Sequence, residues 1–307
     1  CWDAKTKKLY SFDGREKAPK SLDQNYFLDN NGRKKKFWEV VQGGGSVGVP
    51  GTLRLMEFMH KRYGVLKWSK LFEPAINLAR EGFKISPRLF ESISTAQKRG
   101  LDRFPSTRAY FFDDNNIPRS TGSKLINEPL AKTFDLVAQE GADAFYKGDI
   151  AKAIVSAVQG TEVNPGYLTL QDLASYEVKV REPICVPYHQ YNICGMGSPS
   201  SGGLTVGQIL GILENFDLRS LSPTIEAAHL FIEASKLAYA DRNLYMADKD
   251  FISVPEKGLI DKTYLLRRSQ LITKTSSAKV NPGYPLGSEG LLRSLQKQNE
   301  KPGTTHY

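Results

Sequence analysis

A helical pattern longer than any other in the chain runs from Ser222-Pro223 to about Asp248. A serine followed by proline at the first helical position is a strong start signal. Two faces can be traced along the pattern, one with Leu230, Leu237 and Leu244 and the other with Ile225, Ala228, Ile232, Ser235 and Tyr239. A helix with apolar residues on two faces is expected to pack on more than one side. Several neighbouring elements must therefore cover it.

Shorter helical patterns fill much of the remaining sequence. Apolar residues recur with helical spacing, and serine, threonine, proline and glycine mark several of the ends. These patterns predict helices over residues 52–63, 69–80, 129–140 and 149–159, from 86 onward, and from a start within residues 198–203 to about 216, with a start resembling a capping box at 169–172.

Residues 176–196 alternate in the manner of a β-hairpin, and two prolines within them favour a sheet edge. If His189-Gln190 form the turn, Cys185 lies opposite Cys194. A cross-strand disulfide is then geometrically feasible in an oxidising compartment. His-Gln is an unfavourable pair for a tight turn, so two buried free thiols are the default expectation and the disulfide is the alternative.

Length and composition exclude several classes of protein. The 307 residues can form one large domain or two ordinary ones, and no run of about 18 apolar residues predicts a membrane span. The net charge of +9 is partly concentrated in two basic runs without interleaved aromatic residues, which favours a solvated face over nucleic-acid binding. The four histidines share no metal-ligand spacing, so we expect no metal site.

The composition changes after Ile272. Residues 274–303 are rich in Ser, Gly, Pro, Lys, Asn and Gln, and they are expected to form a flexible, solvent-exposed segment that ends at Gly303-Thr304. A threonine hydroxyl is a weak nucleophile, but at the first position of a chain the residue's own α-amine can take its proton. The alternative for Thr304-Thr305 is the start of an ordinary strand.

Three other stretches contain residues that could bind a ligand, take part in catalysis or allow two backbones to pack closely. Arg15 follows a strand-like run and a turn, where it would be held at the mouth of a sheet; the alternative is a surface salt bridge. Ser200-Ser201 precede two glycines and suggest a nucleophile or an oxyanion site, although a capped helix start is the simpler interpretation. Five glycines within residues 43–51, with no Gly-Lys-Ser/Thr after them, indicate close approach of two backbones rather than a phosphate loop.

Five stretches together resemble the gamma-glutamyltranspeptidase family, and they follow the family's order over nearly the whole chain. They are residues 13–19, 44–51, 199–203, 238–242 and 304–307. The resemblance implies an α+β fold, the four-layer αββα sandwich of N-terminal-nucleophile (Ntn) hydrolases, of which this chain is the helix-rich large-subunit part. It assigns residues 1–273 to that part of one domain, 274–303 to a flexible segment before the processing site, and 304–307 to the start of the small subunit.

Family members are inactive precursors that cut themselves. The resemblance implies cleavage between Gly303 and Thr304, after which Thr304 is the nucleophile, and it places Arg15 at the position that binds the α-carboxylate of the γ-glutamyl group. It further implies a gamma-glutamyltransferase and glutathione hydrolase that needs no cofactor. The donor would be glutathione or a related compound, the acceptor an amino acid, peptide or water, and the protein partner the small subunit from the same precursor.

The sequence leaves two alternatives to this function open. One is a cephalosporin or glutaryl acylase of the same family, and the other is a non-catalytic precursor fragment. Arg15 favours the transferase, because its donor carries an amino-acid α-carboxylate. The chain as given, which stops at Tyr307, is expected to be inactive alone. Family members are secreted or periplasmic, so we expect that location, although no signal peptide is visible in the chain.

Overall fold

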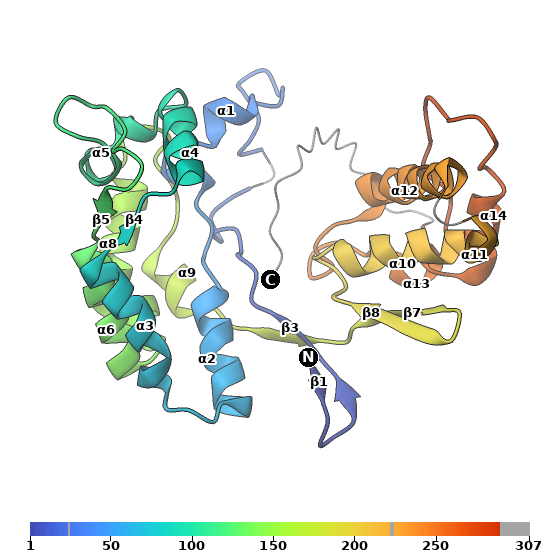
Figure 1. The fold of residues 1–307 in the computed structure, drawn as a ribbon, viewed down its shortest axis with the longest axis horizontal. Coiled ribbons are helices and arrows are strands. Elements are labelled where there is room, and N and C mark those ends of the chain that lie inside the picture. Colours follow the sequence, from blue (N-terminus) through green and yellow to red (C-terminus); the bar gives the residue numbers. More distant parts are fainter. Residues whose placement is uncertain (24, 222–223, 289–307) are drawn as a thin grey trace. The chain divides into compact units, whose positions relative to one another are not determined.

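The structure, a computed structural model, describes residues 1–23, 25–221 and 224–288 (Figure 1). It divides into two compact units. The central unit is Gly14–Val178, and the terminal unit combines Cys1–Asp13 with the residues from Lys179 onward. Gly303 and Thr304, at the predicted processing site, lie outside the described residues. The assignment of residues 1–273 to one domain stays a prediction.

The central unit is mainly helical, and each helix predicted within it begins within one residue of its expected start. The strands β4 (Phe83–Lys84) and β5 (Lys124–Leu125) form an antiparallel pair. The helices are α1 (Phe37–Val40), α2 (Thr52–Tyr63), α3 (Trp68–Glu81), α4 (Pro87–Gln97), α5 (Pro105–Phe111), α6 (Glu128–Glu140), α7 (Asp143–Tyr146), α8 (Gly148–Gln159) and α9 (Leu170–Ala174), with 3-10 turns at Gly44–Ser46 and Leu101–Arg103.

The helix ends in this unit follow local sequence signals. The side chain of Ser86 accepts a hydrogen bond from the backbone N–H of Leu89 and so caps α4. Thr169 and Asp172 form the reciprocal capping box that starts α9. Gly82 ends α3 with a φ of 82°, a conformation that favours glycine.

Two apolar clusters stabilise the central unit. In the first, α3 packs on α6 through Phe72, Ile76, Val137 and Ala138. The second joins the glycine-rich segment to α7, α8 and α9, and its buried members are Val49, Ala142, Tyr146, Ala151, Val158, Leu168, Leu173 and Tyr176. The second cluster also brings Tyr176 to the loop that contains Arg15.

The terminal unit contains short antiparallel strand pairs and a helical layer. The pairs are β1 with β2, β3 with β6, and β7 with β8. The strands are β1 (Trp2–Asp3), β2 (Lys8–Leu9), β3 (Ser11–Asp13), β6 (Lys179–Arg181), β7 (Ile184–Tyr188) and β8 (Tyr191–Gly195). The helices are α10 (Gly202–Leu213), α11 (Leu218–Leu221), α12 (Ile225–Tyr245), α13 (Glu256–Leu259) and α14 (Lys262–Ser269).

The single hairpin predicted over residues 176–196 is wrong in its first part. Within residues 176–196, the hairpin consists of β7 and β8, whereas β6 pairs with β3. Pro183 lies between β6 and β7 and has no N–H to continue a ladder. The ion pair between Arg181 and Asp13, 2.8 Å apart and both 7% exposed, links β6 to β3 instead. His189 adopts a φ of 49°, and this left-handed conformation accommodates His-Gln in the turn.

The long helix is present as α12 and contacts α10. Its cap is the side chain of Thr224 rather than Ser222, which lies outside the described residues with Pro223. The face with Leu230 and Leu237 is buried in a cluster shared with α10 and α14. The other predicted face is exposed in the described chain: Ile225, Ile232 and Tyr239 are 91%, 51% and 44% exposed. Among the described residues, no helix has the length and apolar character to cross a membrane.

Candidate functional site

Arg15 lies in the loop after β3, and the glycine-rich segment 43–51 runs beside this loop. Lys17 and Val49 exchange two backbone hydrogen bonds, from Lys17 N to Val49 O at 3.1 Å and from Val49 N to Lys17 O at 2.7 Å. The hydroxyl of Tyr176 donates to the carbonyl oxygen of Arg15 at 2.6 Å. The backbone of the Arg15 loop is therefore held both by a neighbouring segment and by a side chain from beyond α9.

Two glycines permit this close packing. A Cβ atom at Gly51 would meet the Tyr176 hydroxyl and the carbonyl oxygen of Gly14. A Cβ atom at Gly14 would meet the side chain of Leu55 in α2. The predicted close approach of two backbones is confirmed, and it occurs next to Arg15.

The guanidinium group of Arg15 reaches the surface. Its side chain is 44% exposed and lies 3.2 Å from the carboxylate of Glu16. An exposed pair of this kind contributes about 0.2–1 kcal/mol. A bidentate pair with a substrate carboxylate is stronger, because two parallel charge-assisted hydrogen bonds form. The predicted surface salt bridge is thus present.

Ser201, the second serine of the predicted nucleophile or oxyanion site, interacts with an arginine. Its hydroxyl accepts a hydrogen bond from Nε of Arg242 at 2.9 Å. A guanidinium only donates hydrogen bonds and remains charged, so this partner cannot act as a base. Ser201 is also the N-terminal cap residue of α10, although its side chain makes no capping bond. The contacts favour a structural role at the start of a helix.

Two buried carboxylates of α12 were not predicted from sequence. Glu233 is 2% exposed, and hydrogen bonds led by that from Lys236 lower its pKa from 4.5 to about 2. Asp241 is fully buried, and burial raises its pKa although the charge of Arg268 opposes that shift. Asp241 lies in a stretch that carries the family resemblance, but Glu233 belongs to no motif.

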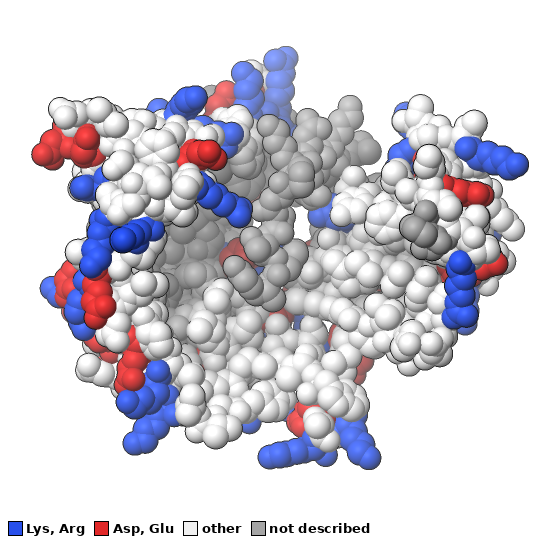
Figure 2. All heavy atoms as spheres, in the orientation of Figure 1, with Lys and Arg blue, Asp and Glu red and all other residues white. Residues whose placement is uncertain are grey.

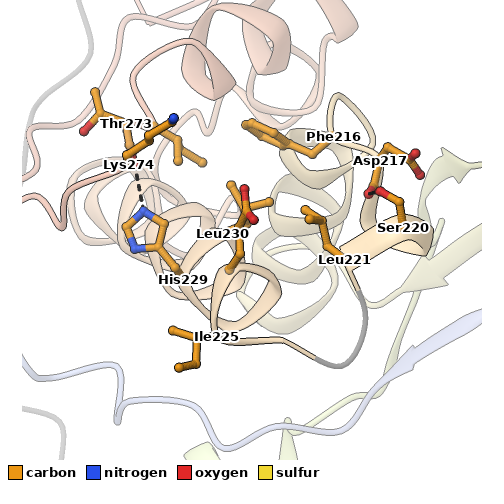
Figure 3. Close-up of a pocket in the computed structure, with 11 residues that line it drawn as sticks. Phe216, Asp217, Ser220, Leu221, Ile225, His229, Leu230, Thr273 and Lys274 are labelled. Carbon is orange, nitrogen blue, oxygen red and sulfur yellow. Dashed lines mark hydrogen bonds between the residues drawn. The ribbon is translucent and has the colours of Figure 1, made fainter.

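A groove of about 710 Å³ opens in the terminal unit beside the start of α12 (Figure 3). Nε2 of His229 lies 2.7 Å from the carbonyl oxygen of Thr273 at one end of it. The other lining residues are Phe216, Asp217, Ser220, Leu221, Ile225, Glu226, Leu230, Ile272 and Lys274. The contact of His229 is with a backbone carbonyl, so it does not pair this imidazole with a nucleophile.

Among the described residues, neither the charged side chains nor the residues that could bind a metal ion indicate a further site. In the view of Figure 2, Lys and Arg side chains lie among Asp and Glu rather than in one continuous patch. Within the ranges that the structure describes, no group of three or more His, Cys, Asp or Glu side chains is placed to hold a metal ion. Cys185 and Cys194 are bonded across the hairpin, with an S–S distance of 2.07 Å. Thr304 is not placed relative to Arg15, because it lies outside the described residues.

Comparison with known proteins identifies relatives over the whole chain. The family model described as Gamma-glutamyltranspeptidase matches residues 1–307. The chain is 37% identical over 313 residues to a "Glutathione hydrolase proenzyme" of Bacillus subtilis (strain 168), covering 100% of this chain and 52% of that protein. It is also 37% identical over 233 residues to an "Acylase ACY 1 proenzyme" of Pseudomonas sp. (strain SE83), covering 76% of this chain and 41% of that protein. The chain thus spans about half the length of these curated relatives.

A solved structure shares the fold. The Helicobacter pylori gamma-glutamyltranspeptidase structure superposes with a TM-score of 0.83 at 36% identity, covering 99% of this chain and 83% of that one. The helical layers and short strand pairs are therefore those of the helix-rich large-subunit part of an Ntn hydrolase. The chain belongs to the gamma-glutamyltranspeptidase family.

Proposed function

We propose that the complete protein is a gamma-glutamyltransferase and glutathione hydrolase, formed from a precursor that cleaves itself between Gly303 and Thr304. The relatives named as glutathione hydrolase proenzymes support the reaction class and the precursor form. The structural observation behind the proposal is Arg15, whose backbone is fixed by Tyr176 and whose guanidinium is exposed. This arrangement suits recognition of a carboxylate by a side chain in a set orientation.

Cleavage would use only groups of the chain and water. Gly303 has no side chain to obstruct attack on its carbonyl carbon. The Thr304 hydroxyl attacks that carbon, the peptide C–N bond breaks, and the acyl group moves from nitrogen to oxygen. This shift frees the α-amine of Thr304. Water then hydrolyses the ester, which releases the carboxylate of Gly303 and restores the Thr304 hydroxyl. Such an amine titrates near 7.7–8.0, so a useful fraction is available as a base at neutral pH.

Transfer would then proceed through a covalent intermediate. Arg15 binds the donor α-carboxylate with two parallel hydrogen bonds. The α-amine of Thr304 takes the proton of its own hydroxyl, whose oxygen attacks the γ-carbonyl carbon and displaces the donor's amine. The resulting γ-glutamyl ester is released by water, an amino acid or a peptide. Such a relay predicts ping-pong kinetics.

The decisive experiment assays the full-length precursor with a γ-glutamyl anilide. Thr304→Ala removes the hydroxyl, so we expect neither cleavage nor turnover. Thr304→Ser keeps a hydroxyl and is the matched control, which should still cleave and turn over at a reduced rate. Turnover by Thr304→Ala equal to that of the unmodified protein would overturn the nucleophile assignment.

The second candidate function is an acylase, because an acylase proenzyme is 37% identical over 76% of the chain. Three anilides distinguish the two functions. The glutaryl anilide lacks only the α-amine of the γ-glutamyl group, and the butyryl anilide lacks both α-amine and α-carboxylate. A transferase is expected to prefer the γ-glutamyl substrate over both. Equal or faster turnover of the glutaryl anilide would favour the acylase.

We also propose a periplasmic or secreted location. The support is the Cys185–Cys194 bond, since disulfides persist mainly in oxidising compartments. Cell fractionation followed by immunodetection tests the location directly. Recovery of the processed protein only from the cytoplasmic fraction would contradict it.

A further inference from the structure

The described residues after α14, 270–288, contact α12 without forming a helix or a strand. We call residues 274–288 the strap; they are the described part of the segment that leads toward Gly303. Their composition predicted a flexible segment. In the structure, two polar clusters, each centred on a buried carboxylate, connect the strap to α12 and α14.

The first cluster holds the beginning of the strap. Oε1 of Glu233 accepts hydrogen bonds from Lys236 Nζ at 2.7 Å and from Ser276 Oγ at 2.9 Å, and Oε2 accepts one from the backbone N–H of Ser277 at 3.2 Å. Lys236 also donates to Ser276 Oγ at 2.8 Å and to the carbonyl oxygen of Ser277 at 3.1 Å. One carboxylate and one ammonium group thus bind both a side chain and the backbone of the strap.

The second cluster holds the middle of the strap. Oδ1 of Asp241 accepts the backbone N–H of Gly283 at 2.8 Å and pairs with Arg268 at 3.2 Å. Arg268 donates to the carbonyl oxygen of Asn281 at 3.1 Å, and the Tyr245 hydroxyl donates to that of Gly283 at 2.7 Å. A Cβ atom at Gly283 would meet the ring of Tyr264, whose hydroxyl also donates to Asp241 at 2.6 Å. Asp241 therefore links the strap to α14.

Burying charged groups is unfavourable unless they are paired and hydrogen-bonded. In both clusters, the hydrogen-bond partners of the buried charges include backbone groups of the strap as well as groups of the helices. These charges therefore keep all of their hydrogen bonds only while the strap stays in place. A segment that only connected two parts of the chain would not require buried carboxylates to bind its backbone, so these bonds indicate that the strap is held in a defined position.

We propose that Glu233, Lys236, Asp241 and Arg268 are positioning residues for precursor cleavage, holding the strap so that the chain enters the processing site from a fixed point. This inference rests on the proposed self-cleavage at Gly303–Thr304. The effective concentration of the Gly303–Thr304 segment at the place where it must sit for cleavage falls roughly as the −3/2 power of the length of chain that tethers it. Releasing the strap lengthens this tether from 20 residues, counted from Gly283 to Gly303, to 34 residues, counted from Ser269 at the end of α14, which predicts cleavage about twofold slower.

The test uses full-length precursor carrying Ser276→Ala together with Tyr245→Phe. These changes remove strap contacts from both clusters and leave every buried charge in place. The matched control is Ser235→Ala on α12, whose hydroxyl donates to Phe231 within the same helix. We expect cleavage to be slower in the double variant only, by up to about twofold, with faster hydrogen exchange in residues 274–288.

A second measurement separates positioning from general stability. The processed enzyme is purified after cleavage of the full-length precursor has gone to completion, so that its turnover no longer depends on the rate of cleavage. With the double variant, kcat and KM of this processed enzyme should match those of the unmodified processed enzyme. Equal impairment of cleavage and turnover, or normal cleavage with a released strap, would overturn the positioning role alone. Failure of the unmodified precursor to cleave at Gly303–Thr304 would overturn the proposed function as well.

Discussion

The hydroxyl of Tyr176 donates a 2.6 Å hydrogen bond to the carbonyl oxygen of Arg15, a residue 161 positions earlier in the chain. Tyr176 is 4% exposed, and its ring belongs to an apolar cluster that includes Tyr146 and Leu173. A buried, packed ring thus fixes the backbone of Arg15, while the guanidinium remains at the surface. The orientation of Arg15 therefore depends on a residue that has no charge and need not touch substrate.

Tyr176→Phe should weaken donor binding without abolishing catalysis. The change removes one hydrogen bond to Arg15, so we expect the free energy of unfolding to fall by about 1 kcal/mol. KM for the γ-glutamyl anilide should rise severalfold, because Arg15 is less firmly held, while kcat changes little. Urea unfolding and steady-state kinetics provide the two measurements. Tyr191→Phe, at an exposed tyrosine of β8, is the control, and an unchanged KM in Tyr176→Phe would contradict the prediction.

Arg15→Lys should raise KM strongly while the protein stays folded. Lysine keeps the positive charge but presents a point charge instead of a planar fork, so the bidentate pair is lost. Hydrogen bonds to charged groups contribute about 1.5–3 kcal/mol. We therefore expect KM to rise roughly ten- to a hundredfold. Arg88→Lys, at an exposed position on α4, controls for the chemical change itself; kinetics identical to the unmodified enzyme would remove Arg15 from the site.

The Cys185–Cys194 bond should be detectable by alkylation and mass spectrometry. Within this chain, the folded oxidised form should offer one thiol, that of Cys1, and the fully reduced, unfolded form three. The bond closes a loop of about ten residues, so replacing both cysteines with serine should lower the free energy of unfolding by about 2–3 kcal/mol. Three alkylated cysteines without reductant would show that the bond does not form.

Glu233 should make stability depend on acid pH. Its pKa is about 2 in the folded state and ordinarily 4.5. Because the folded value is lower, the carboxylate stabilises the fold fully above about pH 4.5, and this contribution is lost as the pH falls toward 2. Glu233→Gln in an uncut Thr304→Ala precursor should therefore flatten the pH dependence of unfolding between pH 5 and 2. Glu226→Gln on the same helix is the matched control, and equal slopes in the two variants would count against the prediction.

Several features of the fold could be predicted because they depend on residues close together in sequence. Ser86 and Leu89 are three residues apart, as are Thr169 and Asp172, and such capping interactions need no tertiary contact. The register of β7 and β8 follows from the position of the turn, which set Cys185 opposite Cys194. The pairing of β6 with β3 could not be predicted in this way, because the paired residues, such as Phe12 and Val180, are far apart in the sequence. The ion pair that links the two strands, between Arg181 and Asp13, spans 168 positions.

The sequence alone predicted the longer helices and the need for small residues near Gly51, and its family resemblance implied the candidate roles of Arg15 and Thr304. The helices and the small residues follow from side-chain chemistry and local backbone geometry. Only the tertiary structure decided that Tyr176 holds Arg15 and that Glu233 and Asp241 hold the strap. In each case a buried side chain bonds to a backbone group that is distant in the sequence. Packing of the fold brings the two groups to within about 3 Å of each other. A linear pattern does not specify such distances, because they result from the packing of the whole unit.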